Sequence, residues 1–288
     1  MSQPTAVVTG ASSGFGRLTA QTLAAAGWRV YATMRNIAGK NAAAAGALRD
    51  AGISVVELDV TSDASVDAAA KAILGEAGTV DVLVNNAVTG YFGVEEAFTP
   101  AAVEQQLATN VVGPLRVNRA FLPSMRENKR GLVVYVSSVV GRLVIPFGGV
   151  YTASKWALEA LAEASSYELA PFGIDVAIVQ PGAYATDIFA NVFSADDPAR
   201  VTAYGDVAKY GEKISESLGA SAQERDPQEI ADAILLLANA PAGERPLRTV
   251  VPANPAVDAI NAAVAPIQRE VMKSFGLEAL LPKALLPH

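Results

Sequence analysis

Tyr151 and Lys155 lie four residues apart, and Ser138 lies thirteen residues before the tyrosine. If Tyr151 opens a helix, positions i and i+4 share a face, so the hydroxyl and the ammonium point into one site. An ammonium about 4 Å from a phenol favours the phenolate by roughly 4 kcal/mol at an effective dielectric of about 20, or about three pKa units. The pair therefore predicts a tyrosine suited to general acid–base catalysis.

Composition excludes several other chemistries. The chain of 288 residues has a net charge of −7 and a pI near 4.9, which argues against a nucleic-acid partner. It contains no cysteine, and its one histidine is His288, so we expect no thiol catalysis, no histidine triad and no metal site. We find no signal peptide and no apolar run long enough to span a membrane, and we expect a cytoplasmic protein.

Short β-rich runs alternate with longer helical patterns along the chain. This alternation predicts an α/β fold with a doubly wound parallel sheet in a single domain, residues 1–252. The expected strands are Ala6–Thr9, Arg29–Thr33, Ser54–Leu58, Val80–Val84, Leu132–Ser137, Asp175–Val179 and Leu247–Val251. The expected helices lie near Gly16–Ala26, Asp63–Glu76, Pro100–Asn128, Thr152–Pro171 and Pro227–Ala240.

Two regions depart from this alternation. The connection Gly182–Arg225 is far longer than an ordinary strand–helix loop, and we interpret about 183–225 as a substrate loop. It carries many of the aromatic residues, namely Tyr184, Phe189, Phe193, Tyr204 and Tyr210. Residues 253–288 form a C-terminal extension, helical through about Ser274. It packs on its own domain, contacts another subunit or covers the site.

A glycine-rich turn joins the first strand to the first helix. Gly10, Gly14 and Gly16 let the backbone turn tightly and approach a pyrophosphate, which then lies at a helix N-terminus. The alternative is a glycine-rich turn without a ligand, which its position after the first strand disfavours. Ser12, Ser13 and Phe15 belong to the same predicted nucleotide loop.

The end of the second strand predicts which dinucleotide binds. A fold that prefers NAD has a carboxylate there, but here the candidate positions hold Met34 and Arg35. A guanidinium favours a 2′-phosphate, so we expect NADP(H) rather than NAD(H). The alternative is that Arg35 is a solvated surface residue. Asp59, after the third strand, either contacts the adenine or caps the next segment.

In order and spacing, the chain resembles the short-chain dehydrogenase/reductase family over residues 5 to about 251. Within the family it resembles the hydroxysteroid and retinol dehydrogenase branch, through residues 31–36, 110–114 and 146–159. Val88 departs from the glycine that commonly follows the Asn-Asn-Ala motif. The motifs are Thr9–Gly16, Asp59–Val60, Asn85–Ala87, Asn110, Ser138, Tyr151 with Lys155, and Pro181–Gly182.

The resemblance implies a Rossmann-type sheet of seven strands and a nicotinamide cofactor. It implies a catalytic set of Asn110, Ser138, Tyr151 and Lys155, in which Lys155 also binds the nicotinamide ribose. Ser138 stabilises the substrate oxygen, and Asn110 holds a water that links Lys155 to solvent. A helix-kinking amide satisfied by backbone is the alternative for Asn110. Further cofactor contacts are Val60, Asn86, Ala87, Pro181, Gly182 and Thr186.

Ser137 is the alternative to Ser138. Because neighbours on a strand face opposite ways, only one of them can serve the site, and the thirteen-residue spacing selects Ser138. The resemblance also implies a homodimer or homotetramer built from the helices near residues 100–128 and 152–171.

The substrate is expected to be a small apolar alcohol or carbonyl compound. Residues 143–147, Tyr91, Phe92 and the aromatic residues of the long loop suggest an apolar pocket, and Arg142 is the one candidate for an acidic substrate. The alternative is that these residues are ordinary core. A non-catalytic dinucleotide sensor or scaffold is the second functional hypothesis, and a redox-neutral lyase or dehalogenase is the third.

Overall fold

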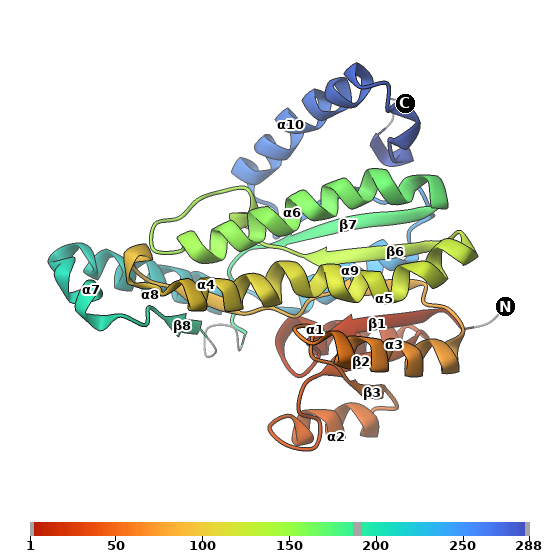
Figure 1. Ribbon diagram of the computed structural model, residues 1–288, viewed down its shortest axis with the longest axis horizontal. Coiled ribbons are helices and arrows are strands. Elements are labelled where there is room, and N and C mark those ends of the chain that lie inside the picture. Colours follow the sequence, from red (N-terminus) through yellow and green to blue (C-terminus); the bar gives the residue numbers. More distant parts are fainter. Residues whose placement is uncertain (1–2, 187–191, 286–288) are drawn as a thin grey trace.

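A parallel seven-stranded sheet forms the centre of the computed structural model, which describes residues 3–186 and 192–285 (Figure 1). The strand order is β3-β2-β1-β4-β6-β7-β9, and all six pairings are parallel. The predicted Rossmann-type α/β sheet is confirmed, with each strand within two residues of its expected bounds. The strands are β1 Thr5–Thr9, β2 Arg29–Met34, β3 Ser54–Glu57, β4 Val82–Asn85, β6 Gly131–Val136, β7 Ile174–Pro181 and β9 Arg248–Val251.

Helices cover both faces of the sheet, which explains the nearly continuous apolar composition of its strands. On one face, Ala6 and Val8 of β1 pack in a core with α1, α2 and α9; on the other, Val7 packs with α3, α5 and α6. The helices are α1 Gly14–Ala25, α2 Ala42–Asp50, α3 Asp63–Ala77, α4 Pro100–Leu107, α5 Gly113–Asn128, α6 Gly149–Leu169, α7 Pro198–Ala203, α8 Lys209–Gln223, α9 Gln228–Asn239 and α10 Pro255–Ser274.

The long helix expected over residues 100–128 is not uniform. α4 and α5 are joined by a π-helical segment, Ala108–Val112, which places Asn110 inside the irregularity. The helix begins where the sequence predicts, because the Thr99 hydroxyl accepts a hydrogen bond from the Ala102 amide at 3.3 Å, ahead of Pro100 at the first helical position.

The region expected to be a long loop is largely helical among its described residues, because α7 and α8 lie within it. It also forms a second sheet, in which β8 (Val192–Ser194) pairs in parallel with β5 (Gly90–Phe92). Neither short strand was predicted, because three residues carry no periodic signal. Phe189 lies outside the described residues.

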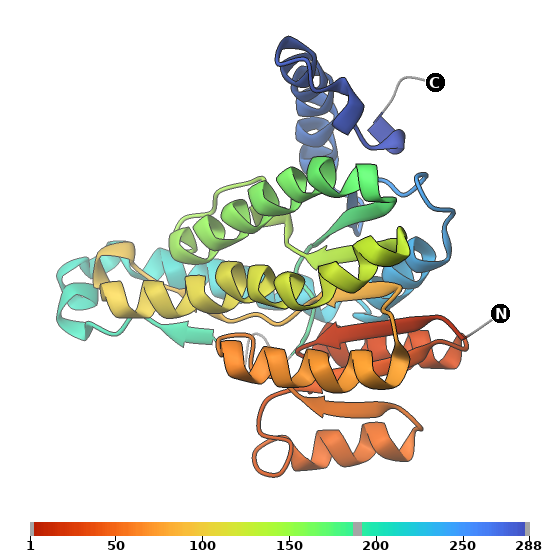
Figure 2. The same cartoon turned by 45° about the vertical axis from the view of Figure 1, so that its right-hand side comes forward.

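The C-terminal extension projects from the domain beyond α6, as Figures 1 and 2 show. α10 ends at Ser274, as predicted, and the chain then turns back. Met272 and Leu281 pack with Tyr167 of α6 in a small separate cluster. The extension therefore contacts its own domain. Among the described residues, no helix combines the length and apolar character needed to cross a membrane.

Candidate active site

The predicted site residues meet at the carboxyl edge of the sheet. Gly10 follows β1, Asn86 follows β4, Ser138 lies just after β6, and Pro181 ends β7. Tyr151 lies in the first turn of α6, the helix that crosses from β6 to β7. In an open parallel sheet, this edge is where ligands bind. The fold therefore brings residues from five separate segments to one place.

Tyr151 and Lys155 occupy one face of α6, as their spacing predicts. Both are buried, and the Lys155 Nζ lies 5.6 Å from the centre of the Tyr151 ring. The ammonium donates a hydrogen bond to the backbone carbonyl of Val136 at 2.9 Å. Lys155 therefore sits between the tyrosine and the end of β6.

Ser138, not Ser137, faces the tyrosine. A hydrogen bond joins the side chains of Ser138 and Tyr151, and the Ser138 Oγ also lies 3.4 Å from the Pro181 carbonyl. The Ser137 hydroxyl points the other way and donates to a buried carboxylate of α6, Glu159, at 3.0 Å. The opposite orientations follow from the alternation of side chains along an extended chain.

Burial dominates the protonation of the pair. Burial raises the pKa of Tyr151 well above its usual value, and the hydrogen bond with Ser138 acts in the opposite direction. The predicted lowering of the tyrosine pKa by Lys155 is wrong, because burial has the larger effect on the phenol and also disfavours the ammonium. Burial lowers the pKa of Lys155 to about 7, although the charge of Glu159 raises it. At neutral pH the tyrosine is thus protonated.

The side-chain amide of Asn110 forms hydrogen bonds with other residues of the protein. Its Nδ2 donates to the Thr89 carbonyl at 2.9 Å and to the Ser154 Oγ at 3.0 Å, and its Oδ1 accepts from the Thr89 amide at 2.9 Å. Both N–H groups of the amide are therefore occupied. This geometry matches the alternative of an amide satisfied largely by backbone, within a helix that the π-segment bends.

The glycine loop forms a cradle that side chains would fill. A Cβ on Gly10 would lie 2.8 Å from the Ala87 Cα, and one on Gly16 would lie 2.5 Å from the Gly10 carbonyl oxygen. Gly10 and Gly14 have φ of +67° and +51°, which favour glycine. The first turn of α1 carries no acidic residue, so its N-terminus is electrostatically open to a phosphate. These residues fit a dinucleotide pyrophosphate.

Thr9 and Asn86 hold this loop against the end of β4. The Thr9 hydroxyl accepts hydrogen bonds from the amides of Asn86 and Ala87 at 3.0 and 3.1 Å. The Asn86 Nδ2 donates to the carbonyls of Thr9 and Gly10 at 2.9 and 3.2 Å. The side chain of Asn86, predicted to contact the cofactor, thus shapes the cradle. The role of Thr9 was missed, although it precedes the first glycine of the motif.

The remaining predicted cofactor residues surround the cradle in different ways. Thr186 lies beside Gly14, where a Cβ would be 3.5 Å from the threonine Cβ. The ring of Phe15 packs edge-to-face on Tyr184, with ring centres 5.5 Å apart. Of the others, Ser12, Ser13 and Gly182 are partly exposed at this edge, whereas Val60 is buried against Gly113.

The two candidate residues at the end of β2 differ in their exposure to solvent. Met34 is buried in the core, whereas the Arg35 side chain is 65% exposed. The Arg35 Nη1 lies 4.0 Å from the Asp59 carboxylate, which also accepts hydrogen bonds from the amide and hydroxyl of Thr61. Arg35 is therefore accessible to a ligand, and Asp59 both caps the following turn and borders the same space.

Not all of the aromatic residues expected in an apolar pocket lie near Tyr151. Phe92 lies against Tyr151, with ring centres 5.0 Å apart. Tyr91 and Tyr184 point elsewhere: Tyr91 packs on Phe98, and the Tyr184 hydroxyl donates to Glu229 at 2.7 Å. Alternation along β5 and burial beneath α9 explain these two corrections.

Phe147 contacts α8, which lies in the segment expected to be a substrate loop, since a Cβ on Gly211 would lie 3.2 Å from its ring. Arg142 is little accessible to a substrate, because its side chain is only 13% exposed and pairs with Glu159 at 3.1 Å. The aromatic composition of the region suggested a pocket without showing which rings face it. The described residues contain no cluster of metal-ligating side chains.

The family model for short chain dehydrogenases matches residues 4–197 of the sequence. The chain belongs to the short-chain dehydrogenase family. Three relatives show where it lies within the family. It is 42% identical to 3-ketodihydrosphingosine reductase of Bacteroides thetaiotaomicron over 62% of this chain and 64% of that one, which is less than two thirds of the relative.

The other two relatives match over a longer part of the chain. Retinol dehydrogenase 8 of Homo sapiens is 36% identical over 80% of this chain and 76% of its own. The human 17-beta-hydroxysteroid dehydrogenase type 1 is 34% identical over 84% of this chain and 76% of its own. The resemblance to the hydroxysteroid and retinol dehydrogenase branch is thus confirmed.

Solved structures agree with this assignment. A short-chain dehydrogenase from Streptomyces avermitilis is 34% identical, with a TM-score of 0.76 over 97% of this chain and 98% of that chain. An alcohol dehydrogenase from Thermococcus sibiricus, complexed with 5-hydroxy-NADP, is 28% identical with a TM-score of 0.69, covering 86% and 96%. A Burkholderia phymatum enzyme in complex with NAD is 26% identical with a TM-score of 0.74, covering 90% and 91%.

Family membership and these neighbours support an oxidoreductase that acts on CH–OH groups with a nicotinamide dinucleotide. Both forms of the dinucleotide occur among the neighbours.

The glycine cradle generates a stability prediction. Gly16→Ala should lower the free energy of unfolding by more than about 1 kcal/mol, because its Cβ would lie 2.4 Å from the Asn86 Nδ2 and 2.5 Å from a backbone oxygen. Gly46→Ala, in the middle of α2 with open space around it, is the matched control and should stabilise by about 0.5–1 kcal/mol. Urea denaturation measures both. Equal effects of the two substitutions would contradict the cradle geometry.

The buried lysine generates a pH prediction. Because the pKa of Lys155 falls from 10.5 to about 7 on folding, the unfolded chain carries a proton that the native chain lacks between these values. The free energy of unfolding of the ligand-free protein should therefore rise from pH 7 to pH 9 by up to about 1.4 kcal/mol per pH unit. Lys155→Met should remove this contribution, whereas Lys71→Met, on the exposed side of α3, should keep it. Denaturation curves at both pH values test this, and a parallel pH dependence in all three proteins would refute it.

Proposed function

We propose that the protein is an NADP(H)-dependent oxidoreductase that interconverts a hydrophobic alcohol and its ketone or aldehyde. The observation that carries the proposal is the convergence of Ser138, Tyr151 and Lys155 beside the glycine cradle, with Phe92 lying against the tyrosine ring. A dinucleotide on the cradle and an apolar substrate beside Phe92 would meet at the tyrosine hydroxyl.

The protein's task in this reaction is to orient the substrate and to move one proton. A bound nicotinamide supplies or accepts the hydride. For reduction, Tyr151 donates its proton to the carbonyl oxygen, and its raised pKa keeps that proton in place at neutral pH. Ser138 donates to the same oxygen and stabilises the charge that develops on it. In oxidation, Tyr151 accepts the proton instead.

Lys155 and Asn110 support the proton transfer. The Lys155 ammonium stabilises the phenolate that remains after donation and binds the ribose of the dinucleotide. Because the Asn110 amide is used on Thr89 and Ser154, Asn110 would bind the relay water through its backbone carbonyl in the π-segment. Waters at that position would carry the proton between Lys155 and solvent.

Arg35 supports the preference for NADP(H). Its exposed guanidinium at the end of β2 lies next to the cradle, and no carboxylate occupies the position that would bind the ribose hydroxyls of NAD. We assign the remaining cofactor contacts to residues near the same edge of the sheet, namely Ser12, Ser13, Val60, Ala87, Pro181, Gly182 and Thr186.

Apolar side chains around Tyr151 support a hydrophobic substrate. Phe92 packs on the Tyr151 ring, and Phe147 lies against α8. Arg142, the one candidate for an acidic substrate, is paired with Glu159. The printed names of the relatives, which include a retinol dehydrogenase and a hydroxysteroid dehydrogenase, agree with an apolar substrate.

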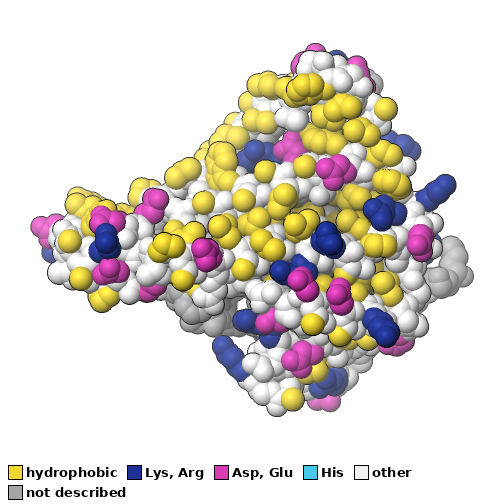
Figure 3. Space-filling view, in the orientation of Figure 1, with side chains coloured by type: hydrophobic (Ala, Val, Ile, Leu, Met, Phe, Trp, Pro, Cys, Tyr) yellow, Lys and Arg dark blue, Asp and Glu magenta, His cyan; other side chains and the backbone are white. Residues whose placement is uncertain are grey.

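Exposed apolar side chains support self-association of the protein. Leu115 on α5 and Trp156 on α6 are 49% and 45% exposed, and both belong to the helices expected to form a dimer or tetramer. α5 and α6 face the viewer in Figure 1, and apolar side chains are spread over the same face in Figure 3. Burial of these side chains in an oligomer would remove apolar surface from water.

Removal of the tyrosine hydroxyl tests the proposed proton donor. Tyr151→Phe should lower kcat for NADPH-dependent ketone reduction by at least about 100-fold, with NADPH affinity nearly unchanged. Tyr91→Phe is the matched control, because this hydroxyl bonds Gln105 and not the substrate. The assay is NADPH oxidation over a panel of apolar ketones, quinones and steroids. Full activity of the Tyr151 variant would exclude this role, and NADPH binding without turnover of any compound by the wild type would favour a sensor.

Substitution of Arg35 tests the cofactor preference. Arg35→Ala should weaken NADPH binding about 10- to 100-fold through the loss of charge-assisted hydrogen bonds, and should change NADH binding little. The control is Arg49→Ala, an exposed arginine on α2. Binding is measured by the fluorescence of the reduced nucleotide. A wild type that binds NADH as tightly as NADPH would show that the 2′-phosphate argument is wrong.

A further inference from the structure

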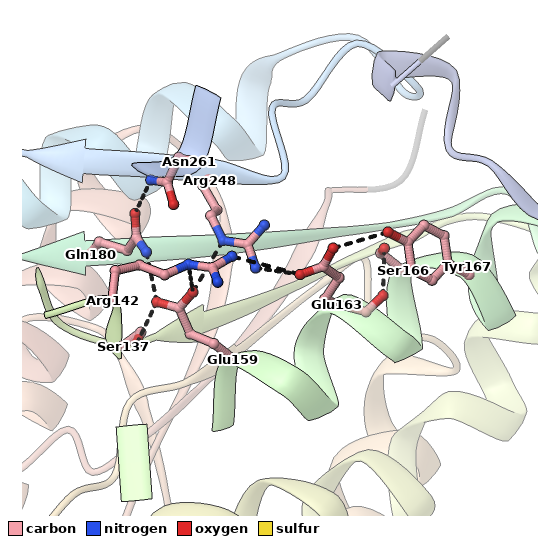
Figure 4. Close-up of polar contacts among 9 residues, drawn as sticks. All are labelled: Ser137, Arg142, Glu159, Glu163, Ser166, Tyr167, Gln180, Arg248 and Asn261. Atoms are coloured by element: carbon pink, nitrogen blue, oxygen red, sulfur yellow. Dashed lines mark hydrogen bonds and ion pairs between the residues drawn. The ribbon is translucent and has the colours of Figure 1, made fainter. Parts of the chain in front are cut away.

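Glu159 is a buried carboxylate one helical turn after Lys155 on α6, and its side chain is 2% exposed. Figure 4 shows the residues around it. Its Oε1 accepts hydrogen bonds from the Ser137 hydroxyl at 3.0 Å and from the Gln180 amide at 2.6 Å. Both donors are buried, so the carboxylate is fixed by partners from two different strands.

These two donors are direct neighbours of residues at the candidate active site. Ser137 precedes Ser138 at the end of β6, and Gln180 precedes Pro181 at the end of β7. Lys155 is one turn from Glu159 on the same face of α6. Three of the segments that meet at the site, those of Ser138, Lys155 and Pro181, are therefore linked to one carboxylate.

Two further features keep the carboxylate in this position. Gly141 leaves the space for it, because a Cβ there would lie 2.5 Å from the Glu159 Oε1. The Gln180 Oε1 accepts a hydrogen bond from the Asn261 amide of α10 at 2.8 Å, which turns the Gln180 amide nitrogen toward Glu159. The C-terminal extension thus reaches the same network.

Two arginines balance the charge of Glu159 and of its neighbour Glu163, one turn further along α6. Arg248 donates to Glu159 at 3.0 Å and to Glu163 at 2.6 Å. Arg142 pairs with the same two carboxylates at 3.1 and 3.7 Å, without hydrogen-bond alignment. The other oxygen of Glu163 accepts from the Tyr167 hydroxyl at 3.0 Å, so its remaining partner lies away from the site.

We propose that Glu159 is a positioning residue for the proton-transfer site, which aligns the segments of Ser138, Lys155 and Pro181 and supplies the negative charge that compensates the buried Lys155 ammonium. This inference rests on the proposed oxidoreductase function. The charged or titratable groups that face this region are Tyr151, Lys155, Glu163 and Tyr167 of α6, Arg142 after β6 and Arg248 of β9. Burial lowers the pKa of Lys155, and Glu159 is the group that opposes this effect.

The test compares Glu159→Gln with Glu163→Gln. Both remove one negative charge and disturb the same two arginines, but only Glu159 contacts Ser137 and Gln180. Glu159→Gln should lower kcat about 10- to 100-fold with little change in the KM for the ketone, because misplaced groups slow the chemical step. Glu163→Gln should lose thermal stability to a similar extent and keep kcat near the wild-type value.

The second readout does not depend on turnover. NADPH affinity, measured by nucleotide fluorescence, should weaken as Lys155 loses its proton with rising pH. In Glu159→Gln the midpoint of this change should move to lower pH by about one to two units, since opposite charges one turn apart interact most strongly. In Glu163→Gln, at twice the spacing, the shift should be at most about half as large.

Equal kcat and equal pH midpoints in the two variants would overturn the proposal and leave a purely structural ion cluster. If Glu159→Gln does not fold, the double variant Arg142→Gln/Glu159→Gln preserves the charge balance and should show the same loss of kcat and the same direction of shift. Absence of NADPH binding by the wild type would instead reject the proposed function, so the two failures are distinguishable.

Discussion

Parallel pairing of the strands is the constraint on which the candidate site depends. Each connection between parallel strands must return to the opposite edge of the sheet, so the carboxyl ends of successive strands lie at the same edge. The glycine loop, Asn86, Ser138 and Pro181 are up to 171 residues apart in the chain and still share that edge. The polar site therefore needs no dedicated domain. It follows from the direction of the strands and from the helices that bury both faces.

The same arrangement makes charge burial unavoidable. Lys155 projects from a helix that must pack on the sheet, so its ammonium is removed from water whenever α6 is in place. A buried charge is tolerated when polar groups surround it. Here the partners are the Val136 carbonyl and the network of Glu159. The helix that carries Lys155 thus has an electrostatic cost, and several polar side chains around it offset that cost.

The sequence predicted the sheet and the meeting of Ser138, Tyr151 and Lys155 better than the details around them. Glycine spacing, apolar runs and the Tyr151–Lys155 pair are local patterns, and the local geometry agreed with them. The directions of Tyr91, Tyr184 and Asn86 were wrong or incomplete because they depend on contacts with Gln105, Glu229 and the glycine loop.

The protonation of Tyr151 was misjudged for a related reason. A charge pair can be recognised from spacing, but desolvation depends on everything packed around the pair. The ion cluster of Arg142, Arg248, Glu159 and Glu163 likewise joins residues from three separate parts of the fold. No periodicity in the chain relates them, so only the folded structure shows the cluster.

The pairing of β5 with β8 has a consequence for how the segment that contains β8, α7 and α8 opens. These three-residue strands close a loop of about a hundred residues, and such long-range contacts form late in folding. Around them, Arg200 of α7 bonds Glu96, and both side chains are about half exposed. Exposed ion pairs contribute little to stability, so the segment should open locally at a small free-energy cost while the parallel sheet stays intact. Hydrogen exchange would then divide the protein into a slow central sheet and a fast outer unit, and variation in the outer unit could change substrate choice without destabilising the fold.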